Sequence, residues 1–384
     1  MFIEVLSRNS EQIVDAVLSG QRLSPDLTQV LFDQCVDLPL LGQLADEVRK
    51  RLCGDVVYYN INSHINPTNV CGYRCSLCAF RRSFDDPTAE TMDFDAMLSL
   101  AQQAADSGCT ELHIVGGLHP QKSFDWYVEI LRKIHDAFPR LHLKAFTAVE
   151  IAHFSRISGL SLDRVLGRLI EAGLGSLPGG GAEIFAPEVR RQIAPGKADG
   201  DLWLDVHRTA HRLGLRSNAT MLYGHVEQLW HRVDHLLRLR ELQDETGGFQ
   251  AFVPLPFHPD GTKLAHLRRA TIFDDLRTIA ASRLILDNFP HIKAYWVALG
   301  VPTAQVALTF GADDLDGTVR QERIYHDAGS QAPEVLSVSE LCRLIREVGR
   351  EPVERDSLYR RVVRQGNHWW IEGESPRDKP IHTN

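Results

Sequence analysis

Three cysteines stand close together in one short run, with three residues between Cys71 and Cys75 and two between Cys75 and Cys78. The next cysteine along the chain, Cys109, lies well outside this run. Iron–sulfur clusters that only transfer electrons are held by four protein thiolates. Three thiolates on one loop instead hold three irons of a cubic [4Fe–4S] cluster and leave the fourth iron open to a small molecule. The run therefore predicts a [4Fe–4S] cluster on Cys71, Cys75 and Cys78.

Two simpler interpretations of this run are a zinc site that lacks one ligand and three unrelated cysteines of the core. Zinc sites usually add a second pair of ligands further along the chain, and no such pair stands out here. The spacing resembles the signature of the radical S-adenosylmethionine (SAM) enzymes. In those enzymes the open iron takes the amino and carboxylate groups of SAM, so the resemblance implies SAM beside the cluster.

The composition of the 384-residue chain excludes several classes of protein. A hydrophobic content of 43% and a charged content of 24% are ordinary for a globular enzyme. The net charge of −8 argues against a nucleic-acid partner, which needs a basic surface. No apolar run reaches the roughly 18 residues of a membrane span. Because the N-terminus lacks a secretion signal, the seven cysteines suggest a reducing cytoplasm.

Hydrophobic periodicity divides the chain into three parts. Residues 1–54 have apolar residues at helical spacing and predict an N-terminal helical cap. Residues 55–328 alternate short apolar runs with amphipathic helices, which indicates parallel strands and an α/β fold. Eight such units predict a (β/α)8 TIM-type barrel, with an incomplete barrel of six strands as the alternative. Residues 329–384 predict a C-terminal helical extension and a polar, loosely packed tail from Gly373.

The expected barrel strands are short apolar runs. They cover 56–61, 111–115, 141–147, 175–177, 216–222, 249–254, 292–297 and 308–311. The expected helices between them cover 93–107, 124–137, 161–172, 201–213, 227–245, 271–288 and 302–307. Barrel enzymes carry their sites at the C-terminal ends of the strands, so the residues that follow each strand are the candidates.

The cysteine loop follows the first strand, and Phe80, Arg81 and Arg82 come directly after it. In radical SAM enzymes the backbone of this stretch contacts the adenine of SAM, which makes Phe80 a candidate for cofactor binding. The two guanidinium groups suit a carboxylate of the substrate, because arginine binds carboxylates through two parallel hydrogen bonds. Solvated surface arginines are the alternative interpretation.

Two adjacent glycines, Gly116 and Gly117, follow the second strand and let the backbone approach a ligand closely. At this place the radical SAM enzymes have a glycine-rich element that receives the methionine amino group of SAM. Its usual third residue is glutamate, whereas this chain has Leu118. The glycines are predicted to bind the cofactor, although this departure weakens the match.

A run of three glycines, 179–181, follows the fourth strand and leads to Glu183. Gly180 then lies in a flexible loop where the resemblance places the ribose of SAM. Glu183 is predicted to accept hydrogen bonds from the ribose hydroxyls and is also a catalytic candidate. The alternative is a glutamate that stabilises the start of a helix through the helix dipole.

The fifth strand carries Asn218 and Thr220, and Gly224 and His225 lie at its exit. The pattern Thr220-x-Leu-x-Gly224-x-x-Glu227 resembles an element that supports the adenine loop in radical SAM enzymes, with threonine in place of the first glycine. Asn218, Thr220 and Gly224 are therefore cofactor-binding candidates. His225 is predicted to act as an acid or base at the strand end, with a structural histidine as the alternative.

The seventh expected strand carries Lys293 and Tyr295, which alternation places on one face. That face points either into the barrel or toward a helix. If it points into the barrel, Lys293 is a candidate for binding an anionic substrate.

Several longer stretches resemble one family of radical SAM enzymes. They are 178–185, 218–225, 241–249, 293–297 and 310–319. Together with the cysteine loop they resemble the aminofutalosine synthase (aminodeoxyfutalosine synthase) family over roughly residues 55–360. Two related families share the scaffold: the hydrogen-abstracting cyclic dehypoxanthine futalosine synthases, and the radical SAM subunit that makes the deazaflavin of coenzyme F420.

The resemblance implies a reaction in the futalosine route to menaquinone. A 5′-deoxyadenosyl radical adds to the enol-ether double bond of 3-[(1-carboxyvinyl)oxy]benzoate, and rearrangement with loss of a carboxyl group gives 6-amino-6-deoxyfutalosine. SAM is then a consumed co-substrate, and a reductant such as flavodoxin or ferredoxin is implied. Since the substrate carries two carboxylates, we expect a cationic partner near the barrel mouth. The candidates are Arg81, Arg82, His225 and Lys293.

Overall fold

A parallel sheet of seven strands forms the centre of the computed structural model, which describes residues 2–33 and 36–374. The strands follow one another in chain order as β2 (Asn62–Ile65), β3 (Glu111–Ile114), β4 (His142–Ala145), β5 (Leu174–Leu177), β6 (Arg216–Tyr223), β7 (Phe249–Pro256) and β8 (His291–Ile292). Their connections pass through helices, as parallel pairing requires. Inward and outward positions alternate along each strand, so every second residue faces the barrel interior.

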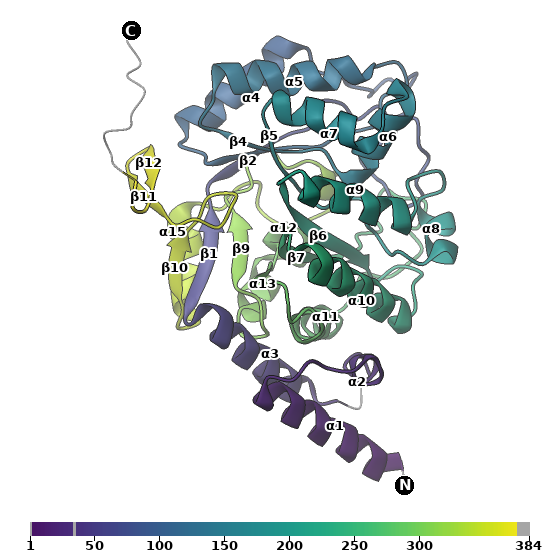
Figure 1. Ribbon diagram of the computed structural model, residues 1–384, viewed down its shortest axis with the longest axis vertical. Coiled ribbons are helices and arrows are strands. Elements are labelled where there is room, and N and C mark those ends of the chain that lie inside the picture. The colour runs from purple at the N-terminus through teal and green to yellow at the C-terminus, as the bar shows by residue number, and fades with distance from the viewer. Residues whose placement is uncertain (1, 34–35, 375–384) are drawn as a thin grey trace.

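An outer layer of helices surrounds this sheet (Figure 1). Its members are α4 (Phe94–Asp106), α5 (Phe124–Ala137), α6 (Ala148–Ser158), α7 (Leu162–Glu171), α8 (Pro187–Ile193), α9 (Gly200–Arg212), α10 (Leu229–Thr246), α11 (Ile272–Ile285) and α13 (Val301–Ala307). Two short helices lie closer to the cavity: α12 (Trp296–Leu299) follows β8, and α14 (Ile324–Asp327) follows β9 (Asp314–Gly317). Several of these helices are capped by the polar residue before their first turn, whose side chain accepts a hydrogen bond from a free backbone N–H. These caps include Asp93, Thr147, Ser161 and Thr271.

The barrel is closed by a segment that joins its two edges. β1 (Val56–Asn60) runs into β2 and pairs in parallel with β9 (Asp314–Gly317). Single bridges connect Lys293 with Asp314 on one side and Ser63 with Arg320 on the other. β9 therefore takes the place of the eighth strand and is linked to the seven-stranded sheet by single bridges. The predicted TIM-type barrel is confirmed, with seven strands in its continuous sheet.

Three of the predicted strands differ from the structure. The predicted first barrel strand, 56–61, coincides with β1, whereas the seven-stranded sheet begins with β2, directly after it. The apolar run 308–311 is a turn after α13, where Gly311 has a φ of +96° and the Ala312 N–H donates to Ala307 at 3.2 Å. The predicted strand 292–297 ends at Ile292 because Trp296 begins α12 and donates its indole N–H to the Gly317 carbonyl at 2.9 Å. In these last two places apolar residues bury themselves in a turn or short helix, which periodicity does not distinguish from a strand.

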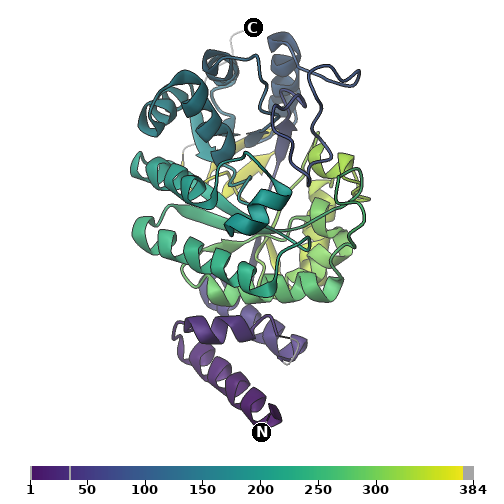
Figure 2. The ribbon, with the colours of Figure 1, turned by 90° about the vertical axis from the view of Figure 1, so that its right-hand side faces the viewer.

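The chain carries additional elements on both sides of the barrel segment. At the N-terminus, α1 (Phe2–Ser19), α2 (Pro25–Val30) and α3 (Leu38–Cys53) extend away from it (Figures 1 and 2). Arg277 of α11 ties this cap to the barrel by donating to the carbonyls of Leu31, Asp33 and Val36. None of the helices in the described part of the chain combines the length and apolar character needed to cross a membrane.

The C-terminal extension contains one helix and three strands. The helix α15 (Val338–Glu347) agrees with the prediction, whereas β10 (Glu351–Glu354), β11 (Val362–Gln365) and β12 (His368–Ile371) were not predicted. β10 pairs with β1 at the edge of a three-stranded sheet, where its proline is tolerated, and β11 and β12 form an antiparallel pair. The predicted loose tail falls mostly on residues 375–384, outside the described residues.

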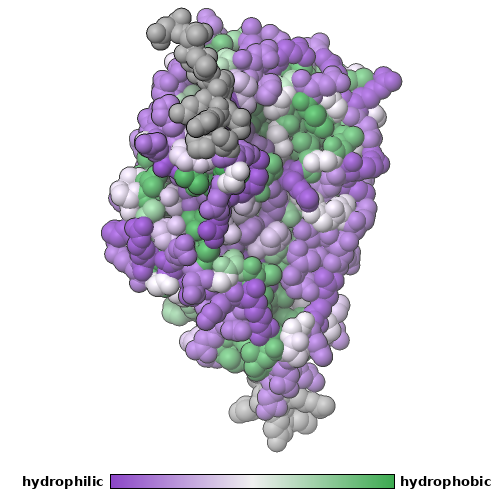
Figure 3. Space-filling view, turned by 60° about the vertical axis from the view of Figure 1, so that its left-hand side comes forward, coloured by the Kyte–Doolittle hydropathy of each residue, from purple (hydrophilic) through white to green (hydrophobic). Residues whose placement is uncertain are grey.

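Apolar side chains gather between the sheet and the helices rather than on the surface. Figure 3 shows one face of the molecule, where hydrophilic residues dominate and hydrophobic residues form scattered areas. One charged group lies deep in this core. Asp313 is fully buried and accepts hydrogen bonds from Arg283 of α11 at 2.6 Å, from His291 at 2.6 Å and from the Ile292 N–H at 2.8 Å. It therefore fixes α11, β8 and the start of β9 to one another.

Asp313→Ala is expected to lower the free energy of unfolding by about 3–5 kcal/mol, because it leaves the guanidinium of Arg283 buried without a counter-charge. Urea denaturation measures this loss. The matched control is Glu347→Ala, which breaks an exposed ion pair with Arg343 and is expected to leave the midpoint unchanged. Equal midpoint shifts in the two variants would contradict the role given to Asp313.

Candidate functional site

One cavity of about 330 Å³ enters the barrel from the C-terminal ends of its strands. Most of the predicted site residues line it. They are Cys71, Cys75, Cys78, Phe80, Arg81, Gly116, Gly117, Gly180, Glu183, Asn218, Thr220 and Lys293. The structure thus brings together residues from the ends of most of the strands, as expected for a site at this end of a barrel.

Three predicted residues lie outside this cavity and hold loops in place instead. The guanidinium of Arg82 donates to the carbonyls of residues 79–81 and so fixes the turn after the cysteine loop. Gly224 and His225 donate their backbone N–H groups to the carboxylate of Glu227 at 2.6 and 2.9 Å. The side chain of His225 is fully buried, with Nε2 placed 3.0 Å from the Leu222 carbonyl.

The cysteine loop is held by backbone hydrogen bonds from three directions. The Gly72 N–H donates to Leu118 at 2.9 Å, the Ser76 N–H to Ile193 at 2.7 Å, and the Cys71 N–H to Arg82 at 3.0 Å. These contacts leave the three thiols facing the same cavity.

The thiols of Cys75 and Cys78 lie in buried surroundings near a cationic side chain. Burial raises the pKa of the Cys75 and Cys78 thiols, while the nearby Lys197 ammonium acts in the opposite direction. In the described part of the chain, no three His, Cys, Asp or Glu side chains converge on one metal ion. A cubic cluster takes each thiolate at a different iron, so its ligands need not converge on one point.

Glu183 and Lys197 form a buried ion pair at the cavity wall, 2.8 Å apart. Burial alone would raise the pKa of Glu183, but the ammonium of Lys197 outweighs it and lowers that pKa. Glu183 also has a φ of +48°, in the left-handed region that side chains other than glycine rarely adopt. Backbone strain of this kind is typical of functional sites, where the surrounding structure holds a side chain in place.

The glycines after β3 are needed for close packing of the backbone. A Cβ atom on Gly117 would lie 2.2 Å from the Val70 carbonyl oxygen, just before the cysteine loop. Beside them, Glu150 accepts a hydrogen bond from the Gly116 N–H at 3.1 Å and one from the Thr147 N–H at 2.7 Å. Burial raises the pKa of the Glu150 carboxyl to about 7.

Two polar side chains of β6 face the cavity with different surroundings. The Thr220 hydroxyl donates to the Gly179 carbonyl at 2.8 Å and so holds the glycine loop. Oδ1 of Asn218 is buried and makes no hydrogen bond to any of the described residues. An unpartnered oxygen at a cavity wall is a natural acceptor for a ligand hydroxyl or amino group.

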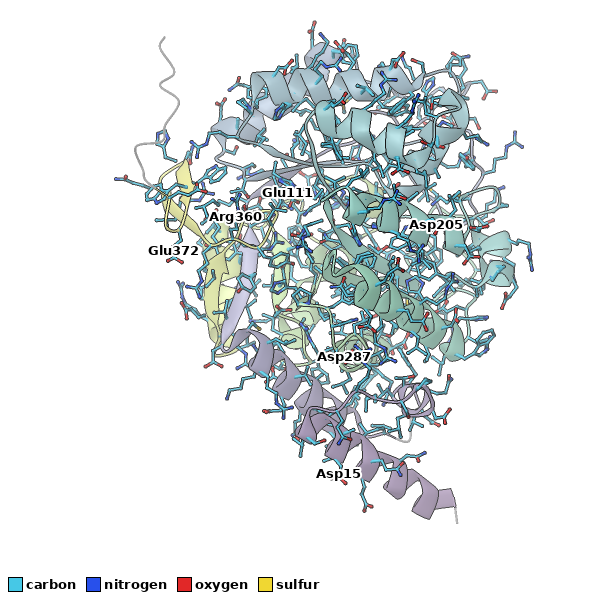
Figure 4. The ribbon with its side chains drawn as sticks, in the orientation of Figure 1. Asp15, Glu111, Asp205, Asp287, Arg360 and Glu372 are labelled. Carbon is cyan, nitrogen blue, oxygen red and sulfur yellow. The ribbon has the colours of Figure 1, made fainter. Side chains whose placement is uncertain are left out.

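The deep end of the cavity is charged. Lys144 is paired with Glu111, and Lys293 lies 3.0 Å from Asp316. Figure 4 shows Glu111 within the ring of strands, whereas Asp205 and Asp287 lie on the outside of the molecule. Both Lys293 and Tyr295 line the cavity, so the face they share points inward.

The segment 322–328, which contains α14, forms a further wall. Glu322, Ile324, Tyr325 and Ala328 line the cavity from this segment. Glu322 accepts a hydrogen bond from Nδ1 of His326 at 2.8 Å, and this bond is the largest cause that raises the pKa of His326, to about 9. A protonated His326 therefore helps to hold this wall.

Sequence similarity to two named relatives shows to which family this chain belongs. The aminodeoxyfutalosine synthase of Thermus thermophilus is 48% identical over 354 residues, which cover 91% of this chain and 95% of the relative. The aminodeoxyfutalosine synthase of Streptomyces coelicolor is 47% identical over 98% of both chains. This chain belongs to the aminodeoxyfutalosine synthase family. Among less similar relatives is a 5-amino-6-(D-ribitylamino)uracil–L-tyrosine 4-hydroxyphenyl transferase of Archaeoglobus fulgidus, 40% identical over 83% of this chain and 92% of the relative.

Two family models match this chain, and two solved structures share its fold. Residues 65–239 match the radical SAM superfamily, which implies a [4Fe–4S] cluster and SAM, and residues 246–366 match the CofH/MqnC C-terminal region. Methylornithine synthase (PylB) has a TM-score of 0.70 at 17% identity, covering 88% of this chain and 97% of its own. The hydrogenase maturase HydG of Carboxydothermus hydrogenoformans has a TM-score of 0.71 at 16% identity, covering 93% and 85%. These two structures share the barrel fold.

Several polar and charged residues of the cavity were not found by the sequence analysis, and five of them illustrate why. They are Glu111, His113, Lys144, Glu150 and Lys197. Glu111 and His113 had a usable signal, because polar residues alternate there within a strand that is otherwise buried. Lys197 had none, since it lies in a loop fourteen residues after its partner Glu183.

Raising the pH is expected to weaken the hold of His326 on the cavity wall. Its pKa is raised from 6.5 to about 9, so its stabilisation is complete below pH 6.5 and is lost as pH rises through 9. The full shift corresponds to about 3 kcal/mol, but His326 is partly exposed, so solvent screening reduces the effect. The excess unfolding free energy of the wild type over His326→Gln should therefore fall by about 2 kcal/mol between pH 6 and pH 10. Urea denaturation at both pH values measures it, and Glu322→Gln should abolish the same pH dependence. A difference that is constant with pH would contradict this account.

Proposed function

We propose that this protein is an aminodeoxyfutalosine synthase of menaquinone biosynthesis. In the proposed reaction, SAM, 3-[(1-carboxyvinyl)oxy]benzoate and water give 6-amino-6-deoxyfutalosine, with release of methionine and of one carboxyl group as bicarbonate. The observation that carries the proposal is the 48% identity to a synthase of that name across 95% of its length. The cavity supports it, because thiols at its mouth and cationic groups at its deep end suit a cluster and an anionic substrate.

The residues at the mouth fit the proposed cofactors. Cys71, Cys75 and Cys78 would hold three irons of the cluster, with the ammonium of Lys197 offsetting part of the thiolate charge. When bound, the cluster and SAM supply the 5′-deoxyadenosyl radical, with electrons from a reductant such as flavodoxin or ferredoxin. Glu183 remains the candidate for accepting hydrogen bonds from the ribose hydroxyls.

SAM would lie against several of the predicted residues. Gly116, Gly117 and Gly180 leave room for the ligand to approach the backbone, and Phe80 lines the same cavity. Oδ1 of Asn218 offers an acceptor that nothing in the described chain occupies. Thr220 and Gly224 would act indirectly, since both hold loops around this space.

In this proposal the protein mainly positions the two substrates and excludes water from the site. Val253, Leu255, Phe257 and Tyr295 supply apolar surface between the mouth and the deep end of the cavity. Such a lining excludes water from a reactive carbon radical. It also holds the two reacting carbons in a near-attack geometry, about 3–3.5 Å apart. Arg81 and Lys293 are the cavity-lining cations proposed to bind the two carboxylates of the substrate.

A second candidate function comes from the relatives at 40% identity, whose name gives 5-amino-6-(D-ribitylamino)uracil and tyrosine as substrates. Tyrosine carries an ammonium group that the enol-ether dicarboxylate lacks. A third candidate is a hydrogen-abstracting cyclase, which releases 5′-deoxyadenosine instead of building it into the product. The synthase is favoured by its higher identity, 47–48% against 40%.

Replacing any one of Cys71, Cys75 or Cys78 with alanine is expected to abolish assembly of an intact cluster, because each is proposed to hold one iron. Iron and sulfide per chain, with the visible absorption of anaerobically reconstituted protein, measure the loss. Cys342→Ala is the matched control and should keep the wild-type content, since Cys342 lies on α15 outside the cavity. Full cluster content in a variant of the run would contradict the assignment of that cysteine.

Anaerobic incubation with SAM, dithionite and 3-[(1-carboxyvinyl)oxy]benzoate is expected to give a substrate-dependent adduct that contains adenine, together with methionine. Mass spectrometry detects both products. Methionine and 5′-deoxyadenosine without an adduct would overturn the synthase reaction. Parallel incubations with tyrosine plus 5-amino-6-(D-ribitylamino)uracil and with dehypoxanthine futalosine then test the two other candidates.

A further inference from the structure

Three polar side chains lie next to one another inside the barrel, across β2, β3 and β4. His64 pairs in register with His113, and His113 pairs with Lys144. All three line the deep part of the cavity, beside Lys293. In most barrels of this class the interior layers are filled by bulky branched apolar residues. A layer of two imidazoles and an ammonium at such a place therefore requires an explanation.

These groups have hydrogen-bonding capacity that the described residues do not fill. An ammonium has three N–H donors, yet Lys144 makes its one hydrogen bond in the described part of the chain to Glu111, and Lys293 makes its one to Asp316. Nε2 of His64 and Nε2 of His113 are buried and have no partner among the described residues. Buried polar groups without partners destabilise a fold, so this layer is arranged for a ligand that brings acceptors.

The charges around the layer show what kind of ligand fits. Glu111 and Asp316 each balance one lysine, while Asp314 is paired with Arg355. Burial lowers the pKa of both His64 and His113, so the imidazoles are neutral and each presents one N–H. The unfilled positions are thus mainly N–H donors on ammonium and imidazole groups. A carboxylate, with about four acceptor positions, is the matching partner.

The layer lies at a distance from the mouth that suits an aromatic acid. Gly116 follows His113 by three positions, and a strand rises about 3.3 Å per residue, so the layer lies about 10 Å from the glycines along this chain. The cavity wall also includes Val253, Leu255 and Tyr295, which offer apolar contact to a ring. A substituted benzoate with its carboxylate on the layer would reach toward the mouth.

We propose that His64, His113, Lys144 and Lys293 form the subsite for the aryl carboxylate of the substrate. This inference rests on the proposed function. The vinyl carbon must meet the adenosyl group held at the mouth, and the acrylate carboxylate is attached to the neighbouring carbon. That carboxylate therefore stays near the mouth, where Arg81 lines the cavity. The carboxylate at the opposite end of the ring is the one that reaches the layer.

Binding without turnover tests the subsite directly. Cluster-loaded protein is titrated calorimetrically, without reductant, with 3-[(1-carboxyvinyl)oxy]benzoate and with 2-phenoxyacrylate, which lacks the aryl carboxylate. We expect Lys293→Met and His113→Leu each to weaken binding of the benzoate about 10- to 100-fold, as for a lost hydrogen bond to a charged group. Binding of 2-phenoxyacrylate should stay within about 2-fold of the wild type, because it makes no contact with the layer. Lys293→Arg and His113→Gln, which keep an N–H donor, should recover part of the loss.

The subsite is overturned if the variants weaken the binding of both ligands equally, or weaken the binding of neither. It is also overturned if the wild type binds the two ligands with equal affinity. Iron content and thermal melting identify a variant that fails to fold, and His64→Gln then takes its place. Loss of the adenine adduct with benzoate-selective binding intact overturns the proposed function and leaves the subsite standing. Formation of the adenine adduct by a protein that binds both ligands equally well would leave the proposed function standing and overturn the subsite.

Discussion

A parallel sheet of short strands encloses a cavity only when its two edges are joined, and here the segment from Asp314 to Arg320 joins them. Its bridges to Lys293 and Ser63 complete the ring, and the His64 N–H donates to the Arg320 carbonyl at 2.8 Å. The segment is strained, since Asp316 and Val319 have φ angles of +65° and +49°. The surrounding pairs compensate for this strain, above all the buried contact of 2.6 Å between Arg355 and Asp314.

Closing the ring separates two chemical environments along one cavity. At the mouth, loops after the strands hold the thiols, the glycines and the Glu183–Lys197 pair. At the deep end, side chains on the strands themselves provide lysines and imidazoles, which the rigid sheet positions more tightly than a loop would. In the proposed function, the radical reaction therefore takes place among the loops at the mouth of the cavity. The aryl carboxylate of the substrate is proposed to bind to side chains on the strands, at the deep end.

The sequence predicts the mouth of this cavity far better than its deep end. Cys71, Cys75 and Cys78 stand within eight residues, and Glu183 follows a glycine run, so local spacing is enough to find them. The deep end joins Glu111, Lys144 and Lys293 from separate strands, and only the register of the sheet brings them together. The eighth strand was misplaced for a similar reason. Apolar residues 308–311 fit a strand pattern, whereas the actual strand is Asp-Leu-Asp-Gly, whose carboxylates gain their partners Arg355 and Lys293 only when the chain folds.

The orientation of the substrate between these two environments is the central claim, and an anaerobic crystal structure with cluster, SAM and 3-[(1-carboxyvinyl)oxy]benzoate tests it most directly. We predict the aryl carboxylate within hydrogen-bonding distance of His113 and Lys293, with the vinyl carbon directed toward the 5′ carbon of SAM. An aryl carboxylate at the mouth beside Arg81, with His64 and His113 contacting neither carboxylate, would contradict the account.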